Sequence, residues 1–220
     1  MNKTVFNLLA IALAPACAFA IDGQVLINQS TVMAAGGFPY VISQPGSYKL
    51  SGNLTMTTTA SGNYAPLGVD AAIVIASSDV ILDLNGFTIQ VSHNLPTNTH
   101  SIYGIVNGGS FALITVRNGT IIINGSGATS VAPSVVVAGV SVAASSNTTI
   151  ENLNVSTLLK SVTTNALFRF TAIEMGTRSL VRHNVSDSSF MFNCPSLIVE
   201  NIASGFGNNA PSCVLVNNLF

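Results

Sequence analysis

The chain has 220 residues, of which 7% are Asp, Glu, Lys or Arg, and its formal net charge is −1. Ordinary globular proteins carry roughly 25% charged residues. Phosphate binding requires a surface with clustered Lys and Arg, and this chain has too few of them. We therefore expect no nucleic-acid partner. No apolar run is long enough to cross a bilayer comfortably, so we do not expect an integral membrane protein.

The first 20 residues predict a cleavable export signal. Lys3 supplies a positive charge, residues 5–15 are mostly apolar, and residues 18–20 (Ala-Phe-Ala) have the small-x-small pattern that signal peptidase cuts. The mature protein would begin at Ile21 and be periplasmic or extracellular. Cys17 leaves a lipoprotein as the alternative, although the segment before it lacks the usual large aliphatic residue.

Two cysteines remain after removal of such a signal, Cys194 and Cys213. An even pair in an oxidising compartment favours a disulfide. The alternative is two separate buried thiols, and the sequence leaves both interpretations open.

A short motif recurs along the chain after residue 70. Each copy has an apolar-x-apolar strand, a small polar turn, a second such strand and a polar pair. Six copies, the last two shorter, begin near residues 73, 105, 140, 173, 197 and 214. One copy cannot bury its apolar side alone, whereas stacked copies bury a continuous core. The repeats predict an all-β fold, a right-handed parallel β-helix, with residues 92–101 and 126–134 as protruding loops.

We expect residues 1–20 to be the signal peptide, residues 21–69 an N-terminal cap with the first coil, and residues 70–220 the remaining coils. Pro45 and Gly46 indicate a tight turn within the capping coil. The alternation of the repeats predicts one buried stack. Its expected members are Ile73, Ile75, Leu82, Leu84, Ile105, Ile114, Val116, Val140, Val142, Ile150, Ile173, Val181, Leu197 and Val199.

Residues 41–50 (VISQPGSYKL) followed by residues 79–89 (DVILDLNGFTI) resemble the start of bacterial right-handed parallel β-helix repeat proteins of the pectin-lyase-like superfamily. The resemblance covers most of the mature chain and is strongest over residues 40–89. It implies the β-helix fold. It implies no single function, because the superfamily includes pectate lyases, polygalacturonases, surface passengers and phage tailspikes.

Two columns of polar residues follow the second strands of the repeats. The first is expected to point outward, stacked about 4.8 Å apart, and contains Asn85, Arg117, Glu151, Arg182 and Glu200. We interpret it as an ion-pair ladder that fixes register, with a sugar-binding strip as the alternative. The second column contains Gly86, Asn118, Asn152, His183 and Asn201. We interpret it as structural, although His183 is a candidate general base with a free pKa near neutral.

The resemblance also directs attention to carboxylates. Polygalacturonase-like sites need several acids on neighbouring coils, and pectate-lyase-like sites need grouped carboxylates that hold calcium. Asp70, Asp79 and Asp83 lie on one early coil and are weak calcium ligand candidates. The simpler interpretation is that Asp79 is a turn residue and Asp83 a solvated surface residue. We therefore expect no cofactor, with Ca2+ as the alternative.

The favoured function is a secreted, non-catalytic β-helix that binds glycan or another surface partner. The alternative is a polysaccharide lyase or glycoside hydrolase with an atypical site. Its candidate catalytic residues are Arg117, Glu151, Arg182 and His183. Residues 214–220 form an apolar strand without a polar cap, so we also expect a free edge there that pairs with itself or with a partner.

Overall fold

The computed structural model describes residues 23–58, 62–93, 97–98, 100–126, 130–131, 136–160, 169–192, 194–204, 206–208 and 213–219. The expected signal peptide, Cys17 and the expected mature N-terminus at Ile21 lie outside the described residues. Across the described ranges, no helix combines the length and the apolar character needed to span a membrane.

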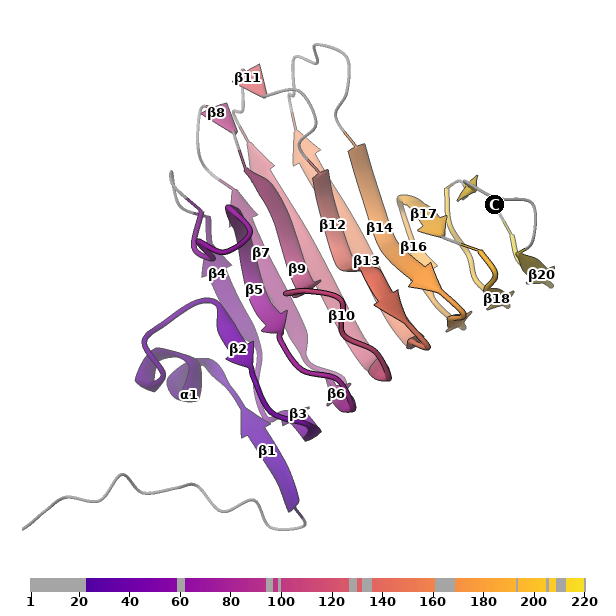
Figure 1. The fold of residues 1–220 in the computed structure, drawn as a ribbon. Helices are drawn as coiled ribbons and strands as arrows, with labels where there is room; N and C mark the ends of the chain where they lie inside the picture. The colour runs from indigo at the N-terminus through magenta and orange to yellow at the C-terminus, as the bar shows by residue number, and fades with distance from the viewer. Residues whose placement is uncertain are drawn as a thin grey trace, which may run out of the picture.

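Short strands of alternating apolar residues stack in parallel into the larger sheet, here called sheet A (Figure 1). In order across the sheet they are β1 (Gln24–Ile27), β3 (Gly46–Leu50), β6 (Val80–Asp83), β10 (Ile114–Ser126), β13 (Thr149–Lys160), β15 (Leu180–Arg182), β18 (Leu197–Val199) and β20 (Val214–Val216). The long strands β10 and β13 continue past a bend. Beyond the bend, sheet A also contains β4 (Leu54–Thr57), β7 (Thr88–His93) and β16 (Val185–Ser186).

Sheet B is formed by the other strand of each coil. In order across the sheet it contains β2 (Tyr40–Ile42), β5 (Val69–Ile75), β9 (Ser101–Asn107), β12 (Val136–Ser146), β14 (Arg169–Thr177), β17 (Ser189–Phe192) and β19 (Phe206–Asn208). The two loops expected to protrude pair with each other through β8 (Thr97–Asn98) and β11 (Ser130–Val131).

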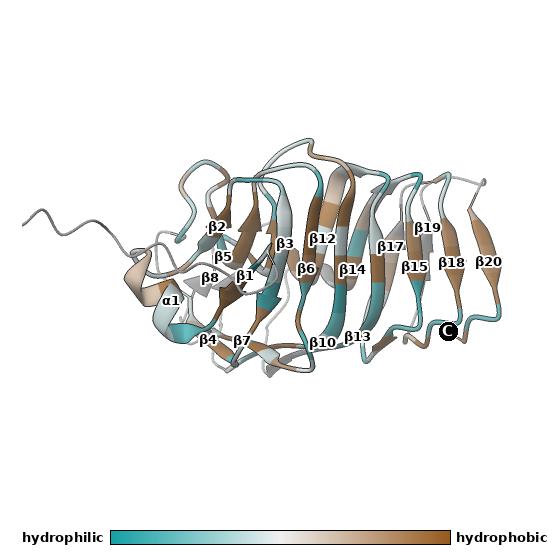
Figure 2. Cartoon of the chain, turned by 90° about the horizontal axis from the view of Figure 1, so that it is seen from below, coloured by the Kyte–Doolittle hydropathy of each residue, from teal (hydrophilic) through white to brown (hydrophobic). Residues whose placement is uncertain are grey.

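Every strand pair of sheets A and B is parallel, and each strand pairs with its counterpart about one coil away in the sequence. In sheet A, Val116 pairs with Ile150, and Ile150 pairs with Val181. The same succession of strands recurs from coil to coil along one axis (Figures 1 and 2). The predicted fold class, an all-β parallel β-helix, is confirmed.

The bends of the coils use single residues with positive φ. In sheet A, the bend after the first strand of each coil has such a residue in six coils: Asn85, Asn118, Asn152, His183, Glu200 and Asn217. Asn adopts this left-handed conformation at little cost because its short side chain hydrogen-bonds locally. The polar pair of each repeat therefore marks a bend.

The core is a continuous stack of apolar side chains between the sheets. Twelve of the fourteen expected members are buried, with exposed fractions of 0–1%. The expectation was wrong for Leu197, which is 41% exposed, and for Val199, which is half-buried, because Ile198 takes the inward position and is 0% exposed. Ile198 pairs with the buried Val181. A run of three apolar residues has no alternation, so pairing with the neighbouring strand sets its register.

The end of the solenoid that carries β1 is covered by the helix α1 (Gln29–Ala34) (Figure 1). Asn28 is its N-cap, and its side chain accepts a hydrogen bond from the N–H of Thr31 at 3.0 Å. Val32 points from this helix into the core and is 0% exposed. The helix therefore shields the first coil from solvent.

Candidate functional site on the outer face of sheet A

Charged residues stack on the outer face of sheet A in a column that begins at Lys49, the partner in register of Asp83. Asp83, Arg117, Glu151 and Arg182 are partners in register on consecutive coils. The expectation was wrong at both ends of this column. Asp83 and not Asn85 precedes Arg117, because the coil that contains Asn85 has a longer bend. Val199 and not Glu200 follows Arg182, because of the register of Ile198.

The four charges from Asp83 to Arg182 form two separate pairs and not a continuous ladder. Arg117 Nε lies 3.0 Å from Asp83 Oδ2. Arg182 Nε donates to Glu151 Oε2 at 2.6 Å. Asp83 also accepts hydrogen bonds from the side chain of Asn118 and from the N–H of Asn85. Both carboxylates are therefore occupied by partners of the protein itself, which suits a structural role that fixes register.

His183 and Glu200 form a third pair at the next bend. His183 Nε2 and Glu200 Oε2 are 2.8 Å apart, and both side chains are about half exposed. The sequence interpretation had placed Asn201 in the same column as His183, but Glu200 holds that position. Of the four catalytic candidates, the structure brings Glu151 and Arg182 into contact, while His183 contacts a residue of the next coil instead.

Asn201 points into the coil and belongs to an interior stack with Asn184 and Asn218, here called the asparagine ladder. Its side chain donates to the carbonyl oxygens of Val181 and Val199 and to Asn218 Oδ1 at 3.0–3.1 Å. Asn184 and Asn201 are both 0% exposed. The 17-residue spacing of the three asparagines was the sequence signal that could have revealed this stack.

The three calcium candidates do not come together. Asp70 is buried in β5, Asp79 lies at an exposed bend with positive φ, and Asp83 is on the outer face beside Arg117. In the described part of the chain, no group of three His, Cys, Asp or Glu side chains could hold a metal ion. These acids therefore sit in three different environments.

An interior histidine was not anticipated from the sequence. His93 is the last residue of β7 and is 1% exposed. Its Nδ1 is 2.9 Å from the hydroxyl of Thr58. Its Nε2 has no hydrogen-bond partner among the described residues. Burial lowers the pKa of the His93 imidazole, and the Asp70 carboxylate opposes this by favouring the charged form. Folding therefore favours the neutral ring.

This arrangement predicts acid sensitivity. Because the pKa of His93 is lower in the folded chain, its stabilising contribution is complete above the unfolded pKa of about 6.5 and is lost as the pH falls below it. We expect the wild-type melting temperature to drop between about pH 7.5 and about pH 5.5, and His93→Gln to reduce that drop. His183→Gln, at an exposed bend, is the matched control. An equal pH response in wild-type and His93→Gln protein would contradict the prediction.

A groove of about 530 Å³ lies beside the outer face of sheet A and is lined by four successive coils, those of β13, β15, β18 and β20. Its floor contains Leu180, Leu197 and Val214, which are partners in register. Its lining also includes Asn147 and Arg178. Arg178 is exposed and forms no ion pair with any described residue. No sequence pattern indicated this groove, because segments from residues 147 to 214 meet there only in the folded chain.

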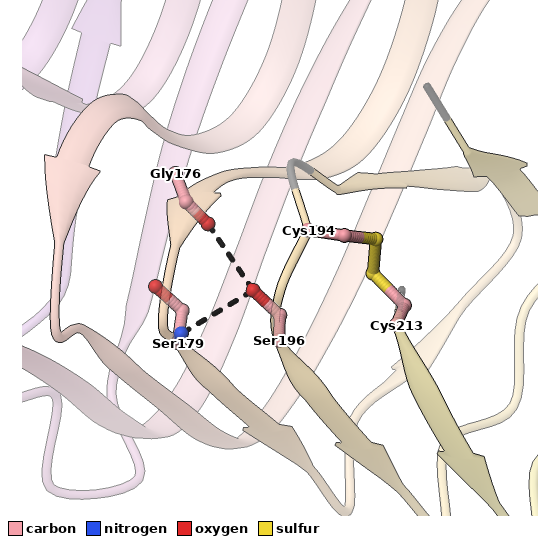
Figure 3. Close-up of a disulfide and its surroundings, with 5 residues drawn as sticks. All are labelled: Gly176, Ser179, Cys194, Ser196 and Cys213. Atoms are coloured by element: carbon pink, nitrogen blue, oxygen red, sulfur yellow. Dashed lines mark hydrogen bonds between the residues drawn. A yellow bond between two sulfur atoms is a disulfide. The ribbon is translucent and has the colours of Figure 1, made fainter. Parts of the chain in front are cut away.

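A disulfide holds the last two coils together next to the groove. Figure 3 shows Cys194 bonded to Cys213. The two cysteines therefore form a disulfide and are not separate thiols. Beside it, the hydroxyl of Ser196 accepts a hydrogen bond from the N–H of Ser179 at 3.3 Å and donates to the Gly176 carbonyl at 3.3 Å. These contacts connect the wall of the groove to three successive coils.

Comparison with known proteins found no relative. No protein-family model, no curated protein and no solved structure matches the chain. The groove and the paired charges are therefore the features from which a function can be inferred.

Proposed function

We propose that this chain is an exported, non-catalytic β-helix that binds a linear polysaccharide along the outer face of sheet A. The observation that carries the proposal is the chemistry of the groove. It combines an apolar floor with the guanidinium of Arg178 and the carboxamide of Asn147, and none of its lining residues is acidic. Glycoside hydrolysis generally needs a pair of carboxylates. A groove without them is suited to binding.

The direction of the groove favours a polymer. Its floor follows successive strands, which are spaced about 4.8 Å apart along the solenoid axis. Aliphatic side chains pack against the C–H faces of sugar rings, and Arg forms bidentate hydrogen bonds with carboxylates. An acidic glycan therefore complements the groove better than a neutral one does, because Arg178 has no acidic partner among the described residues.

Export and family are parts of the same proposal. The N-terminal residues have the pattern of a cleavable signal, and a disulfide between Cys194 and Cys213 suits an oxidising compartment such as the periplasm or the extracellular space. The segments over residues 41–50 and 79–89 support membership of the pectin-lyase-like superfamily.

The binding test is affinity electrophoresis in gels that contain a panel of acidic and neutral polysaccharides. We expect acidic polymers to retard the wild-type chain and Arg178→Gln to lose most of that retardation, because the exposed guanidinium is the cation of the groove. Glu151→Gln is the control, since Glu151 is paired with Arg182 outside the groove. Equal retardation of wild-type and Arg178→Gln protein, or no retardation by any polymer, would overturn the proposal.

The second candidate is a polysaccharide lyase or hydrolase, and the His183–Glu200 pair favours it. A carboxylate 2.8 Å from an exposed imidazole can orient that ring as a general base. The discriminating assay is turnover on the same polymers with and without calcium. Turnover that disappears in folded His183→Asn protein would establish this candidate in place of the binding protein.

A further inference from the structure

The bend that leads into sheet A has a residue with positive φ in four successive coils. These residues, here called the bend column, are Asp79, Leu113, Asn147 and Arg178, with φ of 54–58°. The strands that follow them, β6, β10, β13 and β15, are paired in register, so the four residues lie one above the other along the solenoid axis. Asn147 and Arg178 line the groove.

Leu113 is an unfavourable residue for this conformation. Asp and Asn tolerate a positive φ because their short polar side chains hydrogen-bond locally, whereas a leucine cannot do so and is strained there. Its side chain gains little from the core in return, because Leu113 is 54% exposed. Strain of this kind concentrates at places where the side chain serves binding or catalysis. Leu113 therefore has a conformational cost that its own packing does little to offset.

Leu113 adjoins the groove. Its N–H donates to the carbonyl of Ser146, the residue before Asn147, at 3.2 Å. Adjacent strands are about 4.8 Å apart, so Leu113 lies one coil from Asn147 and two coils from Arg178. The three residues share the same φ at the same place in the coil. Leu113 thus continues the lining of the groove by one coil and adds an exposed apolar side chain to it.

Asp79 limits this surface in the same direction. It is the next member of the bend column and is exposed. Its carboxylate repels an acidic polymer, whereas the guanidinium of Arg178 attracts one. Leu113 is therefore the last favourable contact for an acidic ligand on this side of Arg178.

We infer that Leu113 is a ligand contact that extends the groove and packs against the C–H face of a sugar ring. This inference rests on the proposed function, the binding of an acidic polysaccharide. A ligand that contacts both Leu113 and Arg178 spans two coil spacings, about 10 Å. That distance is longer than one sugar ring, so the extended groove selects an oligomer or polymer over a monosaccharide.

The inference predicts opposite effects of one substitution on stability and on binding. Leu113→Asn is expected to raise the melting temperature by about 2–4 °C, because asparagine relieves the strain at positive φ. In gels that contain acidic polysaccharide, the same variant is expected to lose at least about fivefold in affinity, because the apolar contact is gone. A purely structural residue would not separate the two measurements in this way.

Two further variants serve as controls. Leu113→Met keeps an apolar side chain at the same bend and is expected to bind within about twofold of wild type. Ile202→Asn removes a side chain that is 48% exposed and does not line the groove, so we expect unchanged retardation.

Each of three results would overturn the inference and leave the proposed function standing: equal retardation of wild-type and Leu113→Asn protein, a lower melting temperature of Leu113→Asn, or an equal loss of binding in Ile202→Asn. The absence of retardation of the wild-type chain by any polymer would overturn both.

Discussion

Replacing Ile150 by Asp is expected to prevent folding. Ile150 is 0% exposed and lies between Val116 and Val181 in the inward column of sheet A. An unpaired carboxylate at this position costs several kcal/mol to desolvate. The total stability of a domain is about 5–15 kcal/mol, so one such change removes much or all of it.

The measurement is the yield of soluble protein, its far-UV circular dichroism and its thermal melting. Asn152→Asp introduces the same side chain two residues later at an exposed bend, where Asp tolerates positive φ. This control is expected to melt within a few degrees of wild type. A folded Ile150→Asp protein with unchanged melting would show that the inward column has been misassigned.

Replacing Asn201 by Leu is expected to be the most damaging change among the interior polar residues. Asn201 accepts hydrogen bonds from the N–H and the side chain of Asn184 and donates to Val181 O, among other acceptors. Leucine fills a similar volume but leaves these main-chain groups buried and unpaired. Each unsatisfied group costs about 1–3 kcal/mol, so we expect a loss of about 3–5 kcal/mol.

Equilibrium urea unfolding measures this loss directly. Asn154→Leu is the control, because Asn154 is exposed on the outer face of β13 and is expected to change the unfolding free energy by less than about 0.5 kcal/mol. Equal effects of the two substitutions would mean that the asparagine ladder contributes no more than an exposed amide does.

The outer charges contribute less to stability than the buried residues do. Arg117 and Arg182 each neutralise an acid on the preceding coil, and both arginines are partly exposed. Exposed pairs of this kind contribute at most about 1 kcal/mol. Arg178 differs from them because it has no acidic partner among the described residues and lines the groove. It is therefore the cation that we propose for ligand binding in the groove.

The charged column of the candidate site could be predicted in part from the sequence, because the order of residues repeats along the chain. The pattern of each repeat placed Arg117, Glu151 and Arg182 on successive coils and on the outer face, as the structure has them. The residue that precedes Arg117 in the column was not predicted. Asp83, and not the expected Asn85, holds that position because the bend of its coil is longer. The length of a bend cannot be derived from strand alternation.

What the sequence by itself determined is the class of fold and most of its core. Where apolar and polar residues alternate, the apolar side chains point inward and the polar ones outward, because successive side chains of a strand point to opposite faces. This is a local property of the strand. What only the tertiary structure decided is the register of runs without alternation, such as residues 197–199, and every site that joins distant coils. The contact of His93 with Thr58 spans 35 residues of the chain. The groove at Arg178 likewise exists only because four coils stack. The neighbours of a side chain across a solenoid are set by pairing between coils and not by the adjacent residues in the sequence.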